Sequence, residues 1–112
     1  MRGILLIVID CLRADHVSAY GYARPTTPTI DALADKGVLW ENAFSCSSWT
    51  KPSVTSILTG LYPSAHGSFE GVKRSRNQTA RTDRLQIHRP TLAERFKENG
   101  WRCGAFANNA QL

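Results

Sequence analysis

The hydrophobic pattern of the chain opens with an unbroken apolar run from Ile4 to Ile9, which ends at Asp10. A short run of this kind, rich in β-branched residues, predicts a strand that is buried on both faces. Residues 38–44 and 101–107 predict a second and a third strand. The first run is far shorter than the roughly 20 residues that span a bilayer, so no transmembrane segment is expected.

Helical spacing and helix-end signals predict helices at residues 29–36, 52–58 and 91–99. Pro28 and Gly37 bracket the first helix, with proline near its start and glycine just past its end. Thr91 and Glu94 carry the sequence signature of a capping box at the start of the third. Residues 62–90 show no clear periodicity and are expected to form a loop.

The predicted elements follow the order strand, helix, strand, helix, long loop, helix, strand. This alternation is typical of an α/β fold, in which a mostly parallel sheet is flanked by helices. Parallel sheets are usually larger and covered on both faces, and three strands would leave open edges. We therefore expect residues 1–112 to be a single partial domain, a fragment of a longer catalytic domain.

The composition is globular, with 42% hydrophobic and 21% charged residues, which excludes a disordered chain. The formal net charge is +5, and the excess is concentrated between Glu70 and Arg89. This segment is expected to be a solvated basic loop, or alternatively one that attracts an anionic substrate. No aromatic residue lies between Gly71 and Arg89, so a base-stacking surface and a nucleic-acid partner are not expected. Three widely spaced cysteines and the lack of an export signal predict a reduced, cytoplasmic setting.

Asp10 is the first candidate for chemistry, because it lies at the carboxyl end of the first predicted strand. Ligands of open α/β sheets bind at this edge. A carboxylate after an apolar strand is costly unless it is neutralised, and a divalent metal with oxygen ligands would neutralise it. Asp15 and His16 follow closely and could support such a site. The alternative is that Asp10 caps a turn or pairs with Arg13.

Thr50 is the second candidate, because it lies just before the second predicted helix. The free amides and the dipole at a helix start favour phosphate or sulfate groups. A hydroxyl held there can bind a metal and act as a nucleophile, and Lys51 can add positive charge. The alternative is that Thr50 or Ser53 only caps the helix.

A series of short motifs runs along the chain: LLIVID (5–10), LRADH (12–16), YGY (20–22), TPTIDALA (27–34), Pro52-Ser53, LTGLYP (58–63) and His66-Gly67. These motifs, together with their order, resemble the amino-terminal part of sulfatases. The predicted helix and strand at residues 91–106 also fit, so the resemblance spans nearly the whole chain. It implies membership in the alkaline phosphatase-like superfamily, whose members cleave or transfer sulfate and phosphate esters.

The resemblance implies that Asp10 is a metal ligand and that Thr50 occupies the nucleophile position, where Thr50 could also contact the metal. It implies a divalent cation, Ca²⁺ or Mg²⁺, with Mn²⁺ and Zn²⁺ as alternatives. Lys51 becomes a candidate for charge stabilisation, and Asn108 and Asn109 become candidates for binding the substrate anion. The two asparagines could equally be strand-end amides in a turn.

Several positions depart from the sulfatase pattern. Threonine replaces the Cys or Ser that is oxidised to formylglycine, so formylglycine is not expected. Cys11 replaces a second aspartate, Val54 replaces the motif arginine, and Asn108 and Ala110 replace a lysine and a histidine. Related enzymes with a threonine nucleophile act on phosphodiesters.

We therefore expect a metal-dependent hydrolase of small anionic esters, with phosphoester chemistry favoured over sulfate ester cleavage. The chain ends before the Asp-Asn or Asp-His pair that completes the family's metal site, so alone it is expected to be inactive. The alternative is a pseudoenzyme that binds an anionic ligand or partner without turnover.

His66 is expected to support the loop after the nucleophile helix. A third alternative is a nucleic-acid module that uses the basic loop.

Overall fold

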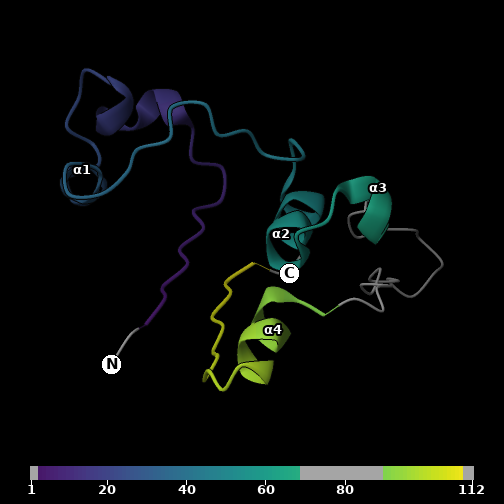
Figure 1. Ribbon diagram of the computed structural model, residues 1–112. Helices are drawn as coiled ribbons and strands as arrows, with labels where there is room; N and C mark the ends of the chain where they lie inside the picture. Colours follow the sequence, from purple (N-terminus) through teal and green to yellow (C-terminus); the bar gives the residue numbers. More distant parts are fainter. Residues whose placement is uncertain (1–2, 69–89, 110–112) are drawn as a thin grey trace. The chain divides into compact units, whose positions relative to one another are not determined.

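The computed structural model describes residues 3–68 and 90–109 of a chain that divides into two compact units. The first unit is Met1–Ala43 and the second is Phe44–Leu112. Figure 1 shows the helical elements of each. The first unit holds two 3₁₀ turns and a helix: η1 (Ala14–His16), η2 (Ser18–Tyr20) and α1 (Pro28–Ala34). The second holds three α-helices: α2 (Thr50–Thr59), α3 (Pro63–His66) and α4 (Leu92–Glu98).

In the first unit, Asp31 on α1 fixes the helix to the preceding turn. Its carboxylate accepts the backbone N–H of Ala19 at 2.9 Å and the hydroxyl of Thr27 at 3.0 Å. The Thr27 hydroxyl accepts the backbone N–H of Ser18 at 3.0 Å. Val17, between η1 and η2, is 3% exposed and is the only buried branched aliphatic side chain among the described residues. Polar contacts therefore hold this unit together as much as apolar ones.

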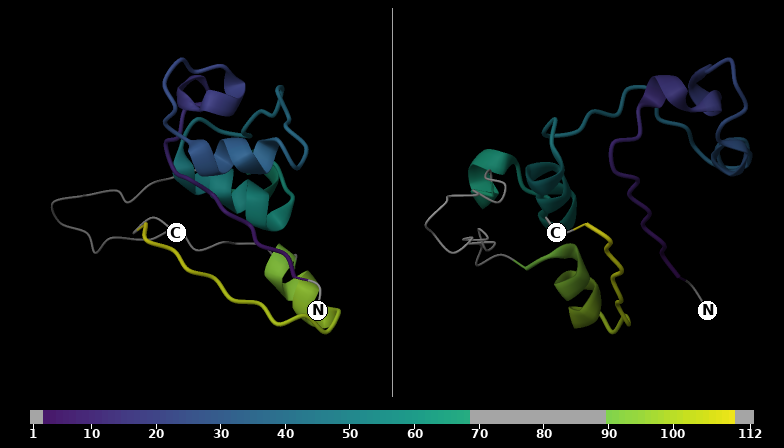
Figure 2. Two further views of the ribbon diagram at one scale, coloured as in Figure 1. Left: turned by 90° about the vertical axis from the view of Figure 1, so that its left-hand side faces the viewer. Right: turned by 180° about the vertical axis from the view of Figure 1, so that it is seen from behind.

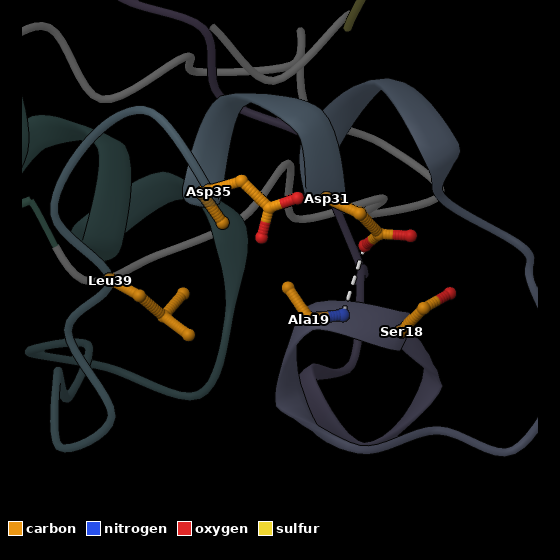
Figure 3. A pocket seen from close by; sticks show the side chains of 6 residues that line it. Ser18, Ala19, Asp31, Asp35 and Leu39 are labelled. Atoms are coloured by element: carbon orange, nitrogen blue, oxygen red, sulfur yellow. Dashed lines mark hydrogen bonds between the residues drawn. The ribbon is translucent and has the colours of Figure 1, made fainter.

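A hollow of about 320 Å³ lies beside this network (Figure 3). Its lining residues are Ser18, Ala19, Asp31, Ala34, Asp35 and Leu39. The oxygen of Asp31 that faces η2 is the one that accepts the Ala19 N–H.

In the second unit, α2 packs against α3, and the extended segment after α4 turns back along that helix (Figures 1 and 2). The reversal occurs at Gly100, whose φ of +80° favours glycine. The ring of Trp101 then meets Phe96 edge-on, with centroids 5.5 Å apart. The thiol of Cys103 donates to the carbonyl oxygen of Ala93 at 3.4 Å. These contacts fix the segment against α4 without forming a sheet.

The predicted α/β fold with a parallel sheet is wrong for the described residues, none of which forms a strand. The side chains of residues 4–9 are 50–83% exposed, whereas a strand inside a sheet would bury them. The apolar pattern favours an extended backbone, but a strand also needs a neighbour that pairs with its N–H and C=O groups. The described segments at 38–44 and 101–107 do not supply that pairing either.

The three predicted helices are confirmed, with shifted ends. The second begins at Thr50, two residues earlier than predicted, which places the candidate nucleophile inside the helix. The capping box is confirmed, since the Thr91 hydroxyl accepts the Glu94 N–H at 3.3 Å and the Glu94 carboxylate accepts the Thr91 N–H at 2.6 Å.

The one-turn helix α3 lies where a loop is predicted. Most of that predicted loop, including its basic residues, falls at 69–89, outside the described part of the chain. Among the described helices, none has the length and apolar character needed to cross a membrane.

Candidate functional site

Thr50 and Lys51 lie in the first turn of α2. Trp49 is the N-cap residue and has an extended backbone, and its side chain makes no capping hydrogen bond. The cap position therefore belongs to neither Thr50 nor Ser53, which removes the capping alternative. Pro52 follows, fully buried, in the first helical turn, where a missing N–H costs no helix hydrogen bond. Thr50 and Lys51 are half-buried, and each interacts with another group of the protein.

A serine-rich loop leads into this turn and is fastened to it through Ser53. The Ser45 hydroxyl donates to the Ser47 carbonyl at 2.7 Å and lies 2.6 Å from the Ser53 hydroxyl. Since its single proton is committed to Ser47, Ser45 accepts the proton of Ser53. The Trp49 backbone N–H donates to the Ser47 hydroxyl at 3.4 Å. The residues just before Thr50 are thus fixed by hydroxyl groups of the same loop and helix.

Asp10, the candidate metal ligand, lies at the end of the extended apolar run in the first unit. The next residue, Cys11, has a φ of +58°, a left-handed conformation that costs a non-glycine residue about 1–2 kcal/mol. Its thiol points to the Asp10 carboxylate, with Sγ 3.6 Å from Oδ1. The sharp turn at Cys11 sets the direction of the chain directly after the carboxylate.

Asp15 joins Arg13 and His16 in an exposed cluster shortly after Asp10. The Arg13 guanidinium donates to both carboxylate oxygens, at 2.6 and 2.9 Å, and the His16 Nδ1 lies 3.0 Å from Oδ1. Hydrogen bonds from Arg13 and then from His16 hold the pKa of Asp15 well below its usual range. The same pairing raises the pKa of Arg13. Because the ionised carboxylate only accepts hydrogen bonds, the His16 ring carries a proton on Nδ1.

The remaining candidates lie at the end of the second unit. Asn108 is exposed and Asn109 is half-buried, both in the extended segment after α4, and Asn109 has an interaction of its own. A feature that the sequence did not predict is the contact between Ser56 and His66, whose side chains are buried together. No signal in the sequence pairs these two residues, because neither belongs to an apolar repeat.

The structure therefore brings Thr50 and Lys51 together on one helical turn. Asp10 lies on the segment before η1, and Asn108 and Asn109 share the segment after α4. Among residues 3–68 and 90–109, no group of three or more His, Cys, Asp or Glu side chains could hold a metal ion. A carboxylate and a hydroxyl are oxygen ligands of the kind that hard divalent cations prefer. Asp10 and Thr50 fit such a cation in chemistry, and a complete ligand set needs further donors.

Comparison with known proteins identifies the family. The sulfatase family model matches residues 2–111. The chain belongs to the sulfatase family. The resemblance of the sequence motifs to sulfatases is confirmed by this match.

Several curated sulfatases are similar to this sulfatase-family chain. An N-acetylgalactosamine-6-O-sulfatase of Bacteroides thetaiotaomicron is 42% identical over 54% of the chain and 12% of its own length. A Delta 4,5-hexuronate-2-O-sulfatase of the same organism is 30% identical over 96% of the chain and 21% of its own length. The iduronate 2-sulfatase of Mus musculus is 34% identical over 88% of the chain and 16% of its own length.

The chain thus spans between about an eighth and a fifth of the length of these relatives. No solved structure matches the chain.

Proposed function

We propose that the protein carrying this chain is a metal-dependent hydrolase of sulfate or phosphate esters, with Thr50 as its nucleophile. Family membership and relatives named as sulfatases support ester hydrolysis. The observation that carries the proposal is that Thr50 is the first helical residue of α2. At this position the backbone amides and the helix dipole favour an anionic ester beside the hydroxyl. Lys51 adds a cation one residue later.

Threonine favours a phosphoester substrate over a sulfate ester. The Thr50 oxygen attacks phosphorus, a new P–O bond forms, and the bond to the leaving alcohol oxygen breaks. The Thr50 proton is released to solvent, and the alcohol oxygen takes a proton from water. A water molecule then attacks the phosphothreonine, which restores the hydroxyl and releases the phosphate product. Sulfate ester cleavage would use the same positions with sulfur in place of phosphorus.

Asp10 and Thr50 would hold a divalent cation, Ca²⁺ or Mg²⁺, with Mn²⁺ or Zn²⁺ as alternatives. When bound, that cation would supply positive charge that favours the ionised form of the Thr50 hydroxyl. Asn108 and Asn109 would donate hydrogen bonds to the ester oxygens. Lys51 would stabilise the negative charge that develops on them.

The test compares Thr50→Ala with Thr55→Ala in the intact protein. Both residues are half-buried threonines of α2, so the second variant controls for a change of the helix. With bis(p-nitrophenyl) phosphate, p-nitrophenyl phosphate and p-nitrophenyl sulfate, we expect Thr50→Ala to lower kcat/KM by at least about 10³-fold. Thr55→Ala should change it less than about threefold. Mass spectrometry of acid-quenched enzyme should find the phosphoryl group on Thr50. Full activity of Thr50→Ala would refute the proposal.

A second candidate function is anion binding without turnover, as in a pseudoenzyme. The substitutions that favour it are Cys11, Val54, Asn108 and Ala110, which stand where the sulfatase pattern has an aspartate, an arginine, a lysine and a histidine. Titration with inorganic phosphate, followed by the indole resonance of Trp49, distinguishes the two. Saturable binding that Thr50→Ala weakens, together with no hydrolysis of the three esters, would support the pseudoenzyme.

A further inference from the structure

The second unit has a buried cluster that is polar. Among its described residues, the buried side chains are Pro52, Ser56, His66 and Ser68. Ser56 is 6% exposed, His66 is 2% exposed and Ser68 is 4% exposed. Burial of polar groups is unfavourable unless each one is hydrogen-bonded. In the described part of the chain every buried side-chain nitrogen and oxygen has a partner.

The hydrogen bonds of this cluster define the protonation of the His66 ring. The backbone N–H of Ser68 donates to His66 Nδ1 at 3.1 Å. A backbone N–H can only donate, so Nδ1 carries no proton and the ring is neutral with its proton on Nε2. The Nε2–H then donates to the Ser56 hydroxyl oxygen, 3.0 Å away. In a ring protonated on both nitrogens, the Nδ1–H would point at the backbone N–H of Ser68, and two donors would repel each other.

The cluster acts on the helix that carries the candidate nucleophile. Ser56 lies on α2, four residues after the buried Pro52, so the two residues share one helix face. His66 is the last residue of α3, which is a single turn and too short to be stable alone. Figure 1 shows α3 directly beside α2. The bond from His66 to Ser56 therefore restrains the rotation of α2 about its own axis.

A small rotation of α2 would displace Thr50. At the radius of about 2.3 Å on which Cα atoms lie, a rotation of about 20° moves each of them by about 0.8 Å. A misplacement near 1 Å at a reacting group can cost about 10²-fold in rate. Thr50 and Ser56 belong to the same ten-residue helix, so a rotation of α2 that displaces Ser56 also displaces the candidate nucleophile.

We propose that His66, locked as the Nε2–H tautomer between Ser56 and the Ser68 amide, is a positioning residue for Thr50. This inference rests on the proposed role of Thr50 as a nucleophile. His66 touches no reacting atom and acts only through α2.

The first experiment measures the tautomer in the intact protein, independently of any activity. Long-range ¹H–¹⁵N correlation spectra of the His66 ring should show a protonated Nε2 and an unprotonated Nδ1. The opposite tautomer, or a doubly protonated ring, would overturn the proposal. This measurement stands even if Thr50 proves not to be a nucleophile.

The second experiment separates positioning from stability. The amide of His66→Gln can place an N–H donor near the position of Nε2, whereas the shorter amide of His66→Asn reaches only the position of Nδ1. We expect kcat per folded molecule to fall about 10- to 10²-fold in Ser56→Ala and His66→Asn, with KM unchanged. His66→Gln should recover most of the rate. Equal rates for His66→Gln and His66→Asn, or an unchanged rate in Ser56→Ala, would overturn the proposal.

A matched control and a readout without turnover complete the test. Ser64→Ala, an exposed serine on the neighbouring α3, should leave the rate unchanged. Ser56→Ala should shift the amide resonances of Thr50 and Lys51, and Ser64→Ala should not. If wild type lacks Thr50-dependent turnover but these resonances shift in Ser56→Ala alone, the proposed function fails and the positioning contact stands. Resonances that do not move in Ser56→Ala would refute the contact itself.

Discussion

At Asp31 and at His66, a single side chain organises the backbone around it. The Asp31 carboxylate accepts a backbone N–H from the preceding turn, and His66 accepts one from Ser68. In each case the same side chain makes a second hydrogen bond, to a hydroxyl group. Removal of such a partner leaves a donor unsatisfied, which costs about 1–3 kcal/mol when that donor is buried. Local order in this chain therefore depends on a few polar residues.

The left-handed backbone at Cys11 predicts that glycine is more stable at this position. This conformation costs a non-glycine residue about 1–2 kcal/mol, and glycine adopts it without that cost. Cys11→Gly should therefore raise the free energy of unfolding by up to about 1 kcal/mol, since glycine also loses some entropy on folding. Urea denaturation of the intact protein measures the change. Cys46→Gly, at an exposed cysteine with ordinary φ, should lower it by about 0.5–1 kcal/mol. Equal effects of the two substitutions would contradict the argument.

The helices of this chain are short elements that depend on their ends. None of the described helices exceeds ten residues, and isolated helices below about 12–15 residues are marginal in water. Each needs support from a cap or from a neighbour. α2 has the serine loop at its start and His66 at its side, whereas α4 has a complete capping box.

The capping box makes the stability of α4 depend on pH. Hydrogen bonds from the Thr91 backbone and then from its hydroxyl lower the pKa of Glu94 below its ordinary value of 4.5. The charged form therefore stabilises α4 above pH 4.5, and the contribution is lost as the pH falls through the lower folded pKa. ¹³Cα shifts of residues 92–98, followed during an acid titration, measure the loss of helix. Glu94→Gln should abolish this dependence and Glu98→Gln should retain it. An unchanged titration in Glu94→Gln would count against the prediction.

At the scale of the whole molecule, the described residues bury few of their apolar side chains. Val17 is buried, whereas long apolar side chains such as Leu5, Trp40 and Phe106 are more than 70% exposed. Full burial of one Val, Leu, Ile or Phe side chain contributes about 1.5–3 kcal/mol. The described residues thus draw little stability from apolar burial.

Substitution of one buried and one exposed valine tests how much stability each position draws from burial. Val17→Ala removes a 3% exposed side chain and should lower the free energy of unfolding by about 1.6 kcal/mol, at about 0.8 kcal/mol for each buried CH₂. Val8→Ala removes one that is 50% exposed, so the loss should be at most half as large. Urea denaturation of both variants gives the two values. Equal losses would mean that residues 4–9 are as buried as a strand within a sheet.

The sequence predicted local features better than the arrangement of the whole chain. Thr91 and Glu94 define a cap through neighbours three residues apart, so the signal and its partner lie in one segment. The run from Ile4 to Ile9 signals an extended backbone, but its predicted sheet needed partners distant in sequence, which periodicity cannot supply. For the site, motif order led correctly to the sulfatase family. The partnership of Ser56 with His66 was missed because it depends on how two helices pack.

The exposed apolar run has a consequence for the solubility of the chain. Six successive aliphatic residues with high β-propensity, no proline and no charge meet the criteria for a segment that can seed cross-β aggregation. Arg2 and Asp10 lie near its two ends, and both are charged, as gatekeeper residues often are. Replacement of Asp10 by a neutral residue would remove one gatekeeper together with a candidate metal ligand. A loss of activity in that variant should therefore be separated from a loss of soluble protein.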